Sequence, residues 1–177
     1  SPYNKEIEKL ADVPNYRDDY LRLLSELNLQ KQKYYLERIA DLENKLLKNP
    51  SDEKLLLQLT DAFISIGDYE SAKKYYEEFL RQYPDADNVR YKFAIHSSWF
   101  KDFCSTKNEL SILLAGDPQN RQYLLLKLKY ALWADEIEPE LSSVIDELEA
   151  TGKNDFEFYT TSASILIRLD EIEKAQN

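Results

Sequence analysis

Residues 53–86 carry the sequence EKLLLQLTDAFISIGDYESAKKYYEEFLRQYPDA. Small and apolar residues recur in it at helical spacing: Leu56, Leu59, Thr60, Phe63, Ala72, Tyr76. Between the two apolar sets stands Gly67, which tolerates a left-handed backbone, followed by Asp68, which suits the first position of a helix. Pro84 ends the stretch. The pattern predicts two short antiparallel helices joined by a tight turn, with Gly67 in a conformation that a β-branched residue resists.

Landmarks of this stretch return with a constant period. Pro50, Pro84 and Pro118 are each 34 residues apart, as are Trp99 and Trp133. The same step carries Gly67-Asp68-Tyr69 onto Lys101-Asp102-Phe103, which keeps the acid and the aromatic that begin the second helix. A fixed period of this length indicates a chain built from stacked copies of one helix pair.

The order and spacing of these residues resemble a tetratricopeptide repeat, whose length is also 34 residues. The resemblance implies an all-α fold, a right-handed α-solenoid of antiparallel helix pairs. It predicts an N-terminal helix or cap over residues 1–15 and repeats over approximately 16–52, 53–86, 87–120, 121–154 and 155–177. The last of these stops inside its second helix, so we expect the sequence to be a fragment of a longer protein.

The two outer repeats are the least regular. Between 16 and 48 there is no Gly or Pro, and the apolar residues form two helical sets: Tyr20, Leu23, Leu24, Leu27, and then Tyr35, Ile39, Leu42, Leu46. Two antiparallel helices with a turn near residues 28–33 are the preferred interpretation, and one long helix is the alternative. In the last repeat we expect Tyr159, Ala163 and Leu166 to point inward, with a turn near residues 169–171.

The resemblance also implies a binding face. Related proteins line the concave side with their first helices and bind a peptide or partner helix there. The residues that this geometry predicts on that side, here called the inner strip, are Leu57, Asp61, Ile64, Tyr91, Lys92, Ile95, Trp99, Leu125, Lys129, Trp133. We expect Trp99 and Trp133 to act as neighbouring apolar anchors. The alternative is that both rings are ordinary packing between helices.

Composition excludes several other classes of function. The net charge of −10 opposes nonspecific binding to nucleic acid. Cys104 is the only cysteine, so an internal disulfide or a thiolate metal cluster is excluded, and the compartment stays open with the cytoplasm favoured. No apolar run is long enough for a membrane span, which predicts a soluble protein. His96 is the only histidine, and no catalytic, metal or cofactor site is predicted.

These observations predict a protein–protein interaction scaffold and not an enzyme. The expected partner is another protein or a peptide with apolar anchors, bound in the concave groove. The alternative is a structural solenoid segment, or a self-association spacer in a larger assembly, without a dedicated peptide ligand. A homo-oligomer is compatible with both.

Overall fold

The computed structural model describes residues 14–152 and 155–176, and every regular element in them is a helix. The helices are α2 (Pro14–Lys48), α3 (Glu53–Ser65), α4 (Tyr69–Gln82), α5 (Asp87–Trp99), α6 (Phe103–Gly116), α7 (Arg121–Ala134), α8 (Leu141–Ala150) and α9 (Phe156–Gln176). The all-α prediction is confirmed. The cap expected over residues 1–15 lies outside the described residues, apart from its last two positions.

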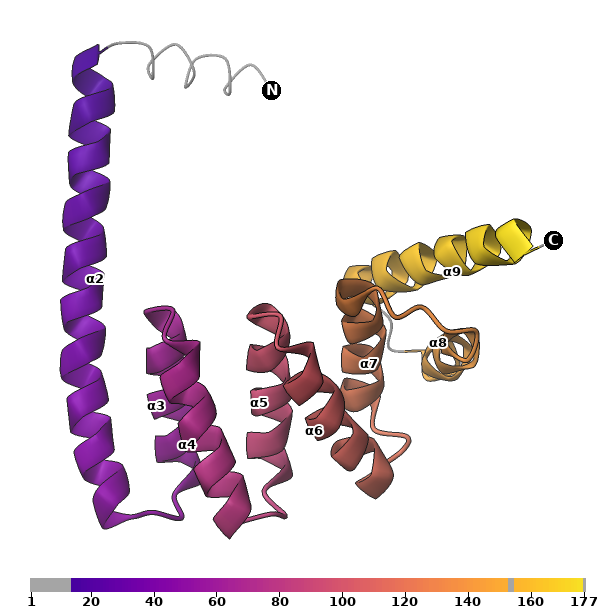
Figure 1. Cartoon of the computed structure of the whole chain (residues 1–177), viewed down its shortest axis with the longest axis horizontal. Helices are drawn as coiled ribbons and strands as arrows, with labels where there is room; N and C mark the ends of the chain where they lie inside the picture. The colour runs from indigo at the N-terminus through magenta and orange to yellow at the C-terminus, as the bar shows by residue number, and fades with distance from the viewer. Residues whose placement is uncertain (1–13, 153–154, 177) are drawn as a thin grey trace.

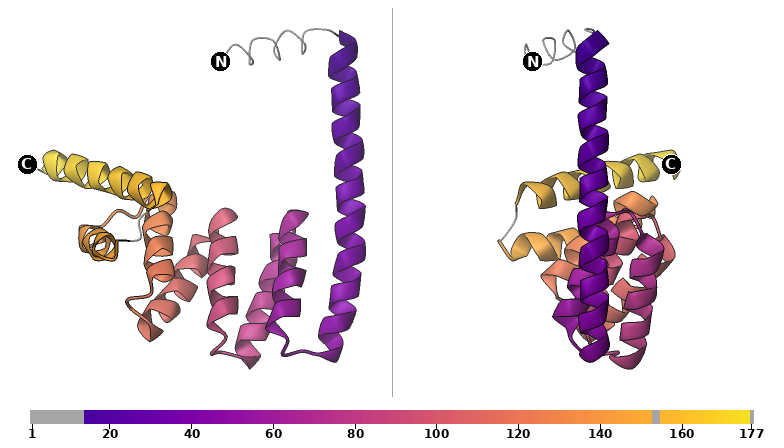
Figure 2. Two further views of the ribbon diagram at one scale, coloured as in Figure 1. Left: turned by 180° about the vertical axis from the view of Figure 1, so that it is seen from behind. Right: turned by 90° about the vertical axis from the view of Figure 1, so that its left-hand side faces the viewer.

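Helices α3 to α6 form two antiparallel pairs in a row, as the solenoid prediction requires, whereas α8 lies across α7 and does not run antiparallel to it (Figures 1 and 2). Helices α3, α5 and α7 lie side by side in one layer, and α4 and α6 lie in the other (Figures 1 and 2). The long helix α2 flanks α3 at one end of the row, and α8 and α9 lie beyond α7 at the other end (Figure 1). The first helices that were expected to carry the inner strip therefore share one layer.

The pair α3–α4 packs through the residues that the sequence pattern singled out. Leu56, Leu59, Thr60, Phe63, Ala72 and Tyr76 are all buried. The hydroxyl of Thr60 donates to the phenol oxygen of Tyr76 at 2.9 Å, so the polar atoms between the two helices are paired. The core of this pair is thus predictable from the 3.6-residue period alone.

The turns after α3, α5 and α7 each contain one residue with a positive φ angle, and these residues are 34 positions apart. Gly67, Lys101 and Asp135 have φ angles of 80°, 60° and 58°, so two of the three positions place a side chain in the left-handed region. After α3, the N–H of Asp68 donates to the carbonyl of Phe63 at 3.0 Å, a bond that closes a Schellman motif. The expected conformation of Gly67 is confirmed.

Substitution at these turns is expected to change stability in opposite directions. Gly67→Val should lower the free energy of unfolding by about 1 to 2 kcal/mol, because a β-branched residue is strained at this φ. Lys101→Gly should raise it by up to about 1 kcal/mol, because it removes the same strain one repeat later. Urea titration of both variants checks the pair. Two changes of the same sign would show that φ does not control stability here.

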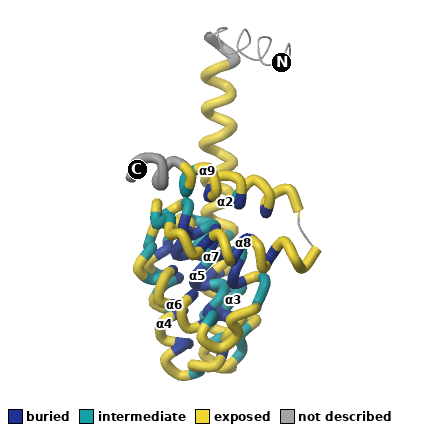
Figure 3. Tube along the Cα trace, turned by 90° about the vertical axis from the view of Figure 1, so that its right-hand side faces the viewer, coloured by how far each residue is buried: buried dark blue, intermediate teal, exposed yellow. Residues whose placement is uncertain are grey.

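Residues 16–48 form one helix, so the preferred prediction of two is wrong. Lys33 and Tyr34 stand 34 residues before Gly67 and Asp68, and they supply neither a glycine for the turn nor a carboxylate for the helix start. The second half of α2 packs against the α3–α4 core through Tyr35, Ile39, Leu42 and Leu46. Residues 17–34 are exposed on every side of the helix (Figure 3).

The last segment also differs from the expected repeat. Helix α9 continues from Phe156 to Gln176 without a turn near residues 169–171, because no glycine interrupts it. Within residues 156–170 of this helix the buried side chains are Phe158, Ser162 and Ile165, and the predicted inward residues Tyr159, Ala163 and Leu166 are exposed. The inward face is therefore offset by one residue from the prediction, and α9 packs on α7 and α8 as a single helix.

Candidate partner-binding face

The structure distributes the inner strip over α3, α5 and α7. Leu57 and Ile64 are half-buried beside the α3–α4 core. Most of the remaining strip residues are also half-buried: Tyr91, Lys92, Ile95, Leu125, Lys129. The exposed members are Asp61, Trp99 and Trp133. Trp99 is 58% exposed and Trp133 is 47% exposed, so neither indole is enclosed between helices.

Both lysines of the strip are engaged by carboxylates. Lys92 Nζ lies 3.2 Å from Asp61 Oδ1, which ties α5 to α3. Lys129 Nζ lies 2.7 Å from Glu157 Oε1, so the start of α9 reaches the strip residues of α7. The charges of the two lysines are therefore neutralised by these ion pairs, and the largest exposed apolar side chains of the strip are Trp99 and Trp133.

A buried histidine lies directly beneath the strip. His96 is 1% exposed, its Nδ1 lies 2.9 Å from the hydroxyl of Tyr76, and its ring centroid lies 5.0 Å from that of Trp99. Its Nε2 lies 3.3 Å from Asp61 Oδ1. The pKa of His96 is lowered from 6.5 to about 4, chiefly by burial and also by the charge of Lys92, while the carboxylate of Asp61 opposes both effects. Both ring nitrogens of His96 thus have polar partners, and the buried ring packs beneath Trp99 of the strip.

Asp102 connects one helix pair to the next. It caps α6 by accepting from the Ser105 N–H at 3.2 Å, and it also accepts from Tyr69 Oη at 2.8 Å and from Lys73 Nζ at 2.7 Å. Partial burial alone would raise the pKa of this carboxyl, but the bonds from Lys73, Ser105 and Tyr69 hold it well below its usual range. The sequence predicted only the capping role of Asp102.

A signal for this connection does exist in the sequence. Lys107 Nζ lies 2.7 Å from Glu136 Oε2, which is the pair Lys73–Asp102 moved on by 34 residues. A basic residue and an acidic residue therefore recur 29 positions apart in successive repeats. The two ion pairs follow one another along the end of the molecule where the turns with positive φ lie.

A second network that the sequence did not indicate joins α5 and α6. The Arg90 guanidinium contacts the Glu109 carboxylate, and both side chains are about nine-tenths buried. Arg90 Nη2 also donates to the carbonyl of Pro84 at 2.8 Å, and Asn108 Nδ2 donates to Glu109 Oε1 at 2.9 Å. This ion pair fixes the start of α5 against α6. A hydrophobic–polar pattern would assign both charged side chains to the surface, so the pattern gave no sign of their burial.

Concave space is also found away from the strip. A pocket of about 510 Å³ lies among α2, α3 and α4, lined by apolar residues such as Leu47, Leu56, Tyr75 and Phe79, and it includes none of the inner-strip residues.

Among residues 14–152 and 155–176, no three His, Cys, Asp or Glu side chains are placed to hold a metal ion. In the same described ranges, no helix combines the length and the hydropathy needed to cross a bilayer.

Comparison with known proteins agrees with this architecture. Residues 53–95 match the family model described as tetratricopeptide repeat, so the resemblance stated from the sequence is confirmed for this stretch. A solved structure entitled "MamA RS-1 ArsTM double mutant" is similar in fold, with a TM-score of 0.59 and 15% identity. The match covers 88% of this chain and 96% of that one, so the likeness extends over nearly the whole row of helices. No curated protein matches the sequence.

Proposed function

We propose that this protein is an interaction scaffold that holds an apolar segment of a partner protein against the inner strip, with Trp99 and Trp133 as its anchors. The observation that carries the proposal is the pair of open indoles at equivalent positions on α5 and α7. An indole combines a large apolar area with one N–H donor and is enriched at the centres of binding sites.

The charges of the strip favour an apolar ligand over an acidic one. Lys92 and Lys129 already contact Asp61 and Glu157, so binding a carboxylate would first require one of these pairs to open. The half-buried Ile95 lies on the α5 face between Tyr91 and Trp99, four residues from each, and extends the apolar surface. The expected partner segment therefore presents apolar side chains at a spacing that meets both indoles.

A displayed library of helical peptides tests the proposal. Peptides selected on the unmodified protein should bind Trp99→Ala and Trp133→Ala about 30-fold more weakly, the loss expected for an anchor worth about 2 kcal/mol. The folded state should lose little stability, because both rings are largely exposed. Phe156→Ala is the matched control, since Phe156 is an exposed ring on α9 outside the strip. Unchanged binding to the double tryptophan variant would contradict the proposal.

A further inference from the structure

A second concave site lies between α2 and α4, away from the inner strip. This pocket of about 510 Å³, here called the α2–α4 pocket, has Leu46 and Leu47 of α2 on one side and Tyr75 and Phe79 of α4 on the other. Leu56 of α3 also lines it and is 1% exposed, so the base of the pocket reaches the core of the α3–α4 pair. None of the strip residues lines it, so one ligand can occupy the pocket while another occupies the strip.

Contacts between its two sides give the pocket a fixed shape. Tyr75 and Phe79 lie about one turn apart on α4, and the ring centroid of Tyr83, just beyond the end of the helix, lies 4.7 Å from that of Phe79. The Tyr75 hydroxyl donates to Glu43 Oε1 at 2.7 Å, which joins α4 to α2. Burial and the neighbouring Glu43 carboxylate raise the pKa of Tyr75 to about 12, so this hydroxyl keeps its proton at neutral pH. A ligand therefore meets a preformed site, and little has to be ordered when it binds.

The charged side chains at the pocket are acidic. Among the described residues that line it, Glu43 and Glu78 carry the charge. Glu78 is already bound by Arg81 and Gln82. Glu43 is half-buried and accepts the hydrogen bond from Tyr75, but within residues 14–152 and 155–176 it forms no ion pair with a basic side chain. A carboxylate that has lost part of its hydration is stabilised by a cation, so the pocket favours a ligand that brings one.

A comparable pocket farther along the row differs in charge. It has a volume of about 410 Å³, lies among α6, α7 and α8, and is lined by Lys107 and Lys127 together with Glu136 and Glu138. Its two signs of charge balance, whereas those that line the α2–α4 pocket do not. The net charge of −10 also attracts basic ligands to the whole molecule. Charge complementarity therefore selects the α2–α4 pocket as the site for a basic ligand.

We propose that the α2–α4 pocket binds a basic segment of a partner protein, which inserts one apolar side chain between α2 and α4 and places a lysine or arginine against Glu43. The apolar side chain gains buried area over Leu56 and Phe79, and the cation forms an ion pair in a partly desolvated place. A basic ligand separates this site from the inner strip, whose lysines are already bound by carboxylates.

Two small probes of similar shape and opposite charge test the pocket. Phenethylammonium and 3-phenylpropionate carry the same ring, and nuclear magnetic resonance titration of the unmodified protein follows the amide signals of Glu43 and Tyr75. Phenethylammonium should bind in the millimolar range, at least about tenfold more tightly than 3-phenylpropionate. Glu43→Gln keeps an acceptor for Tyr75 and removes the charge, so it should weaken phenethylammonium about fivefold. Glu37→Gln is the matched control, because Glu37 is exposed on the same helix and does not line the pocket.

Displayed peptides test the partner segment. A library selected on the double variant Trp99→Ala with Trp133→Ala, which lacks the strip anchors, should yield peptides with a basic residue beside an apolar one. Glu43→Gln and Leu47→Ala, each added to this background, should weaken these peptides about fivefold. Leu36→Ala should not, because Leu36 is an exposed leucine of α2 outside the pocket.

Equal affinity for the two probes, selection of no peptide or only of peptides without basic residues, or binding unchanged by Glu43→Gln would each overturn the proposal. Circular dichroism verifies that each variant is folded. The probe titration uses the unmodified protein, so it decides the charge preference even where a variant loses stability. The selected peptides bind without the strip anchors, so this proposal and the proposed function of the inner strip fail independently.

Discussion

Replacing Glu109 by leucine is expected to lower the free energy of unfolding by about 3 to 5 kcal/mol, because it leaves the Arg90 guanidinium buried without its counter-ion. Both side chains are about nine-tenths buried between α5 and α6. The carbonyl of Pro84 would remain as an acceptor for Arg90, but one neutral carbonyl does not balance a buried charge. Urea unfolding followed by circular dichroism measures the loss.

The double variant Arg90→Met with Glu109→Leu separates the pair from the packing around it. Apolar replacements of similar volume remove both charges together, so the double variant should recover most of the stability that Glu109→Leu loses. A double variant as unstable as the single one would mean that Pro84 and Asn108 depend on the pair for their own geometry. A loss below about 1 kcal/mol for Glu109→Leu would show that Arg90 finds water when its partner is removed.

Acid is expected to destabilise the protein between about pH 6.5 and pH 4 through His96. Burial holds the pKa of the folded His96 at about 4, below its ordinary value of 6.5. The unfolded chain therefore binds a proton at a pH where the folded chain does not, and stability falls as pH decreases through this range. The expected loss from His96 is about 2 to 3 kcal/mol at pH 4.5 relative to pH 7.

The variant His96→Gln isolates this effect, because glutamine keeps hydrogen-bonding groups and does not titrate. Its stability should differ less between pH 7 and pH 4.5 than that of the unmodified protein, even if its absolute stability at pH 7 is lower. Asp102 is not expected to contribute in most of this range, since its carboxyl stays ionised in the folded chain and, with an ordinary pKa of 3.8, is largely ionised in the unfolded chain as well. Identical pH dependence in both proteins would show that His96 takes up its proton over the same pH range in the folded and the unfolded chain.

The parts of the fold that were predictable depend on local signals. In α3 and α4 the apolar period, the glycine at the turn and the capping aspartates all indicate the same helix pair, and the structure agrees. Residues 16–48 have the apolar period but lack the turn residues, so a helix continues where a turn was expected. The period indicates that helices exist, whereas their ends depend on one or two residues such as Gly67 and Asp68.

The candidate site was predictable only as a face. The spacing of Trp99 and Trp133 was sufficient to place both indoles at equivalent points of adjacent helices, and both are exposed. The spacing carried no information about Lys129, because its partner Glu157 is on α9, a helix whose packing departs from the repeat. His96 and Arg90 are paired across helices with residues 19 to 35 positions away in the sequence, at separations for which no local rule exists.

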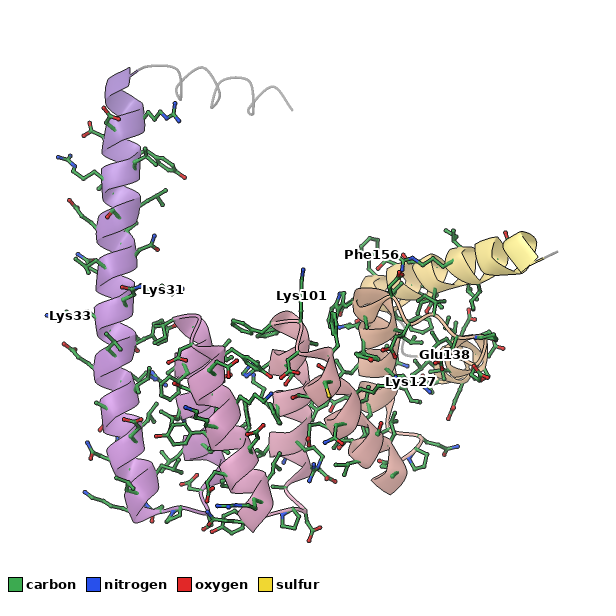
Figure 4. All side chains as sticks on the ribbon, in the orientation of Figure 1. Lys31, Lys33, Lys101, Lys127, Glu138 and Phe156 are labelled. Atoms are coloured by element: carbon green, nitrogen blue, oxygen red, sulfur yellow. The ribbon has the colours of Figure 1, made fainter. Side chains whose placement is uncertain are left out.

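The ion pairs Lys73–Asp102 and Lys107–Glu136 join successive helix pairs along one end of the row. Both pairs lie at the end of the molecule marked by Lys101, where the turns with positive φ are (Figure 4). Trp99 and Trp133 lie two residues before Lys101 and Asp135, at this same end of the molecule. The ion pairs that join successive helix pairs there therefore favour a constant separation of the two indoles, and a partner segment meets anchors whose spacing is already set before it binds.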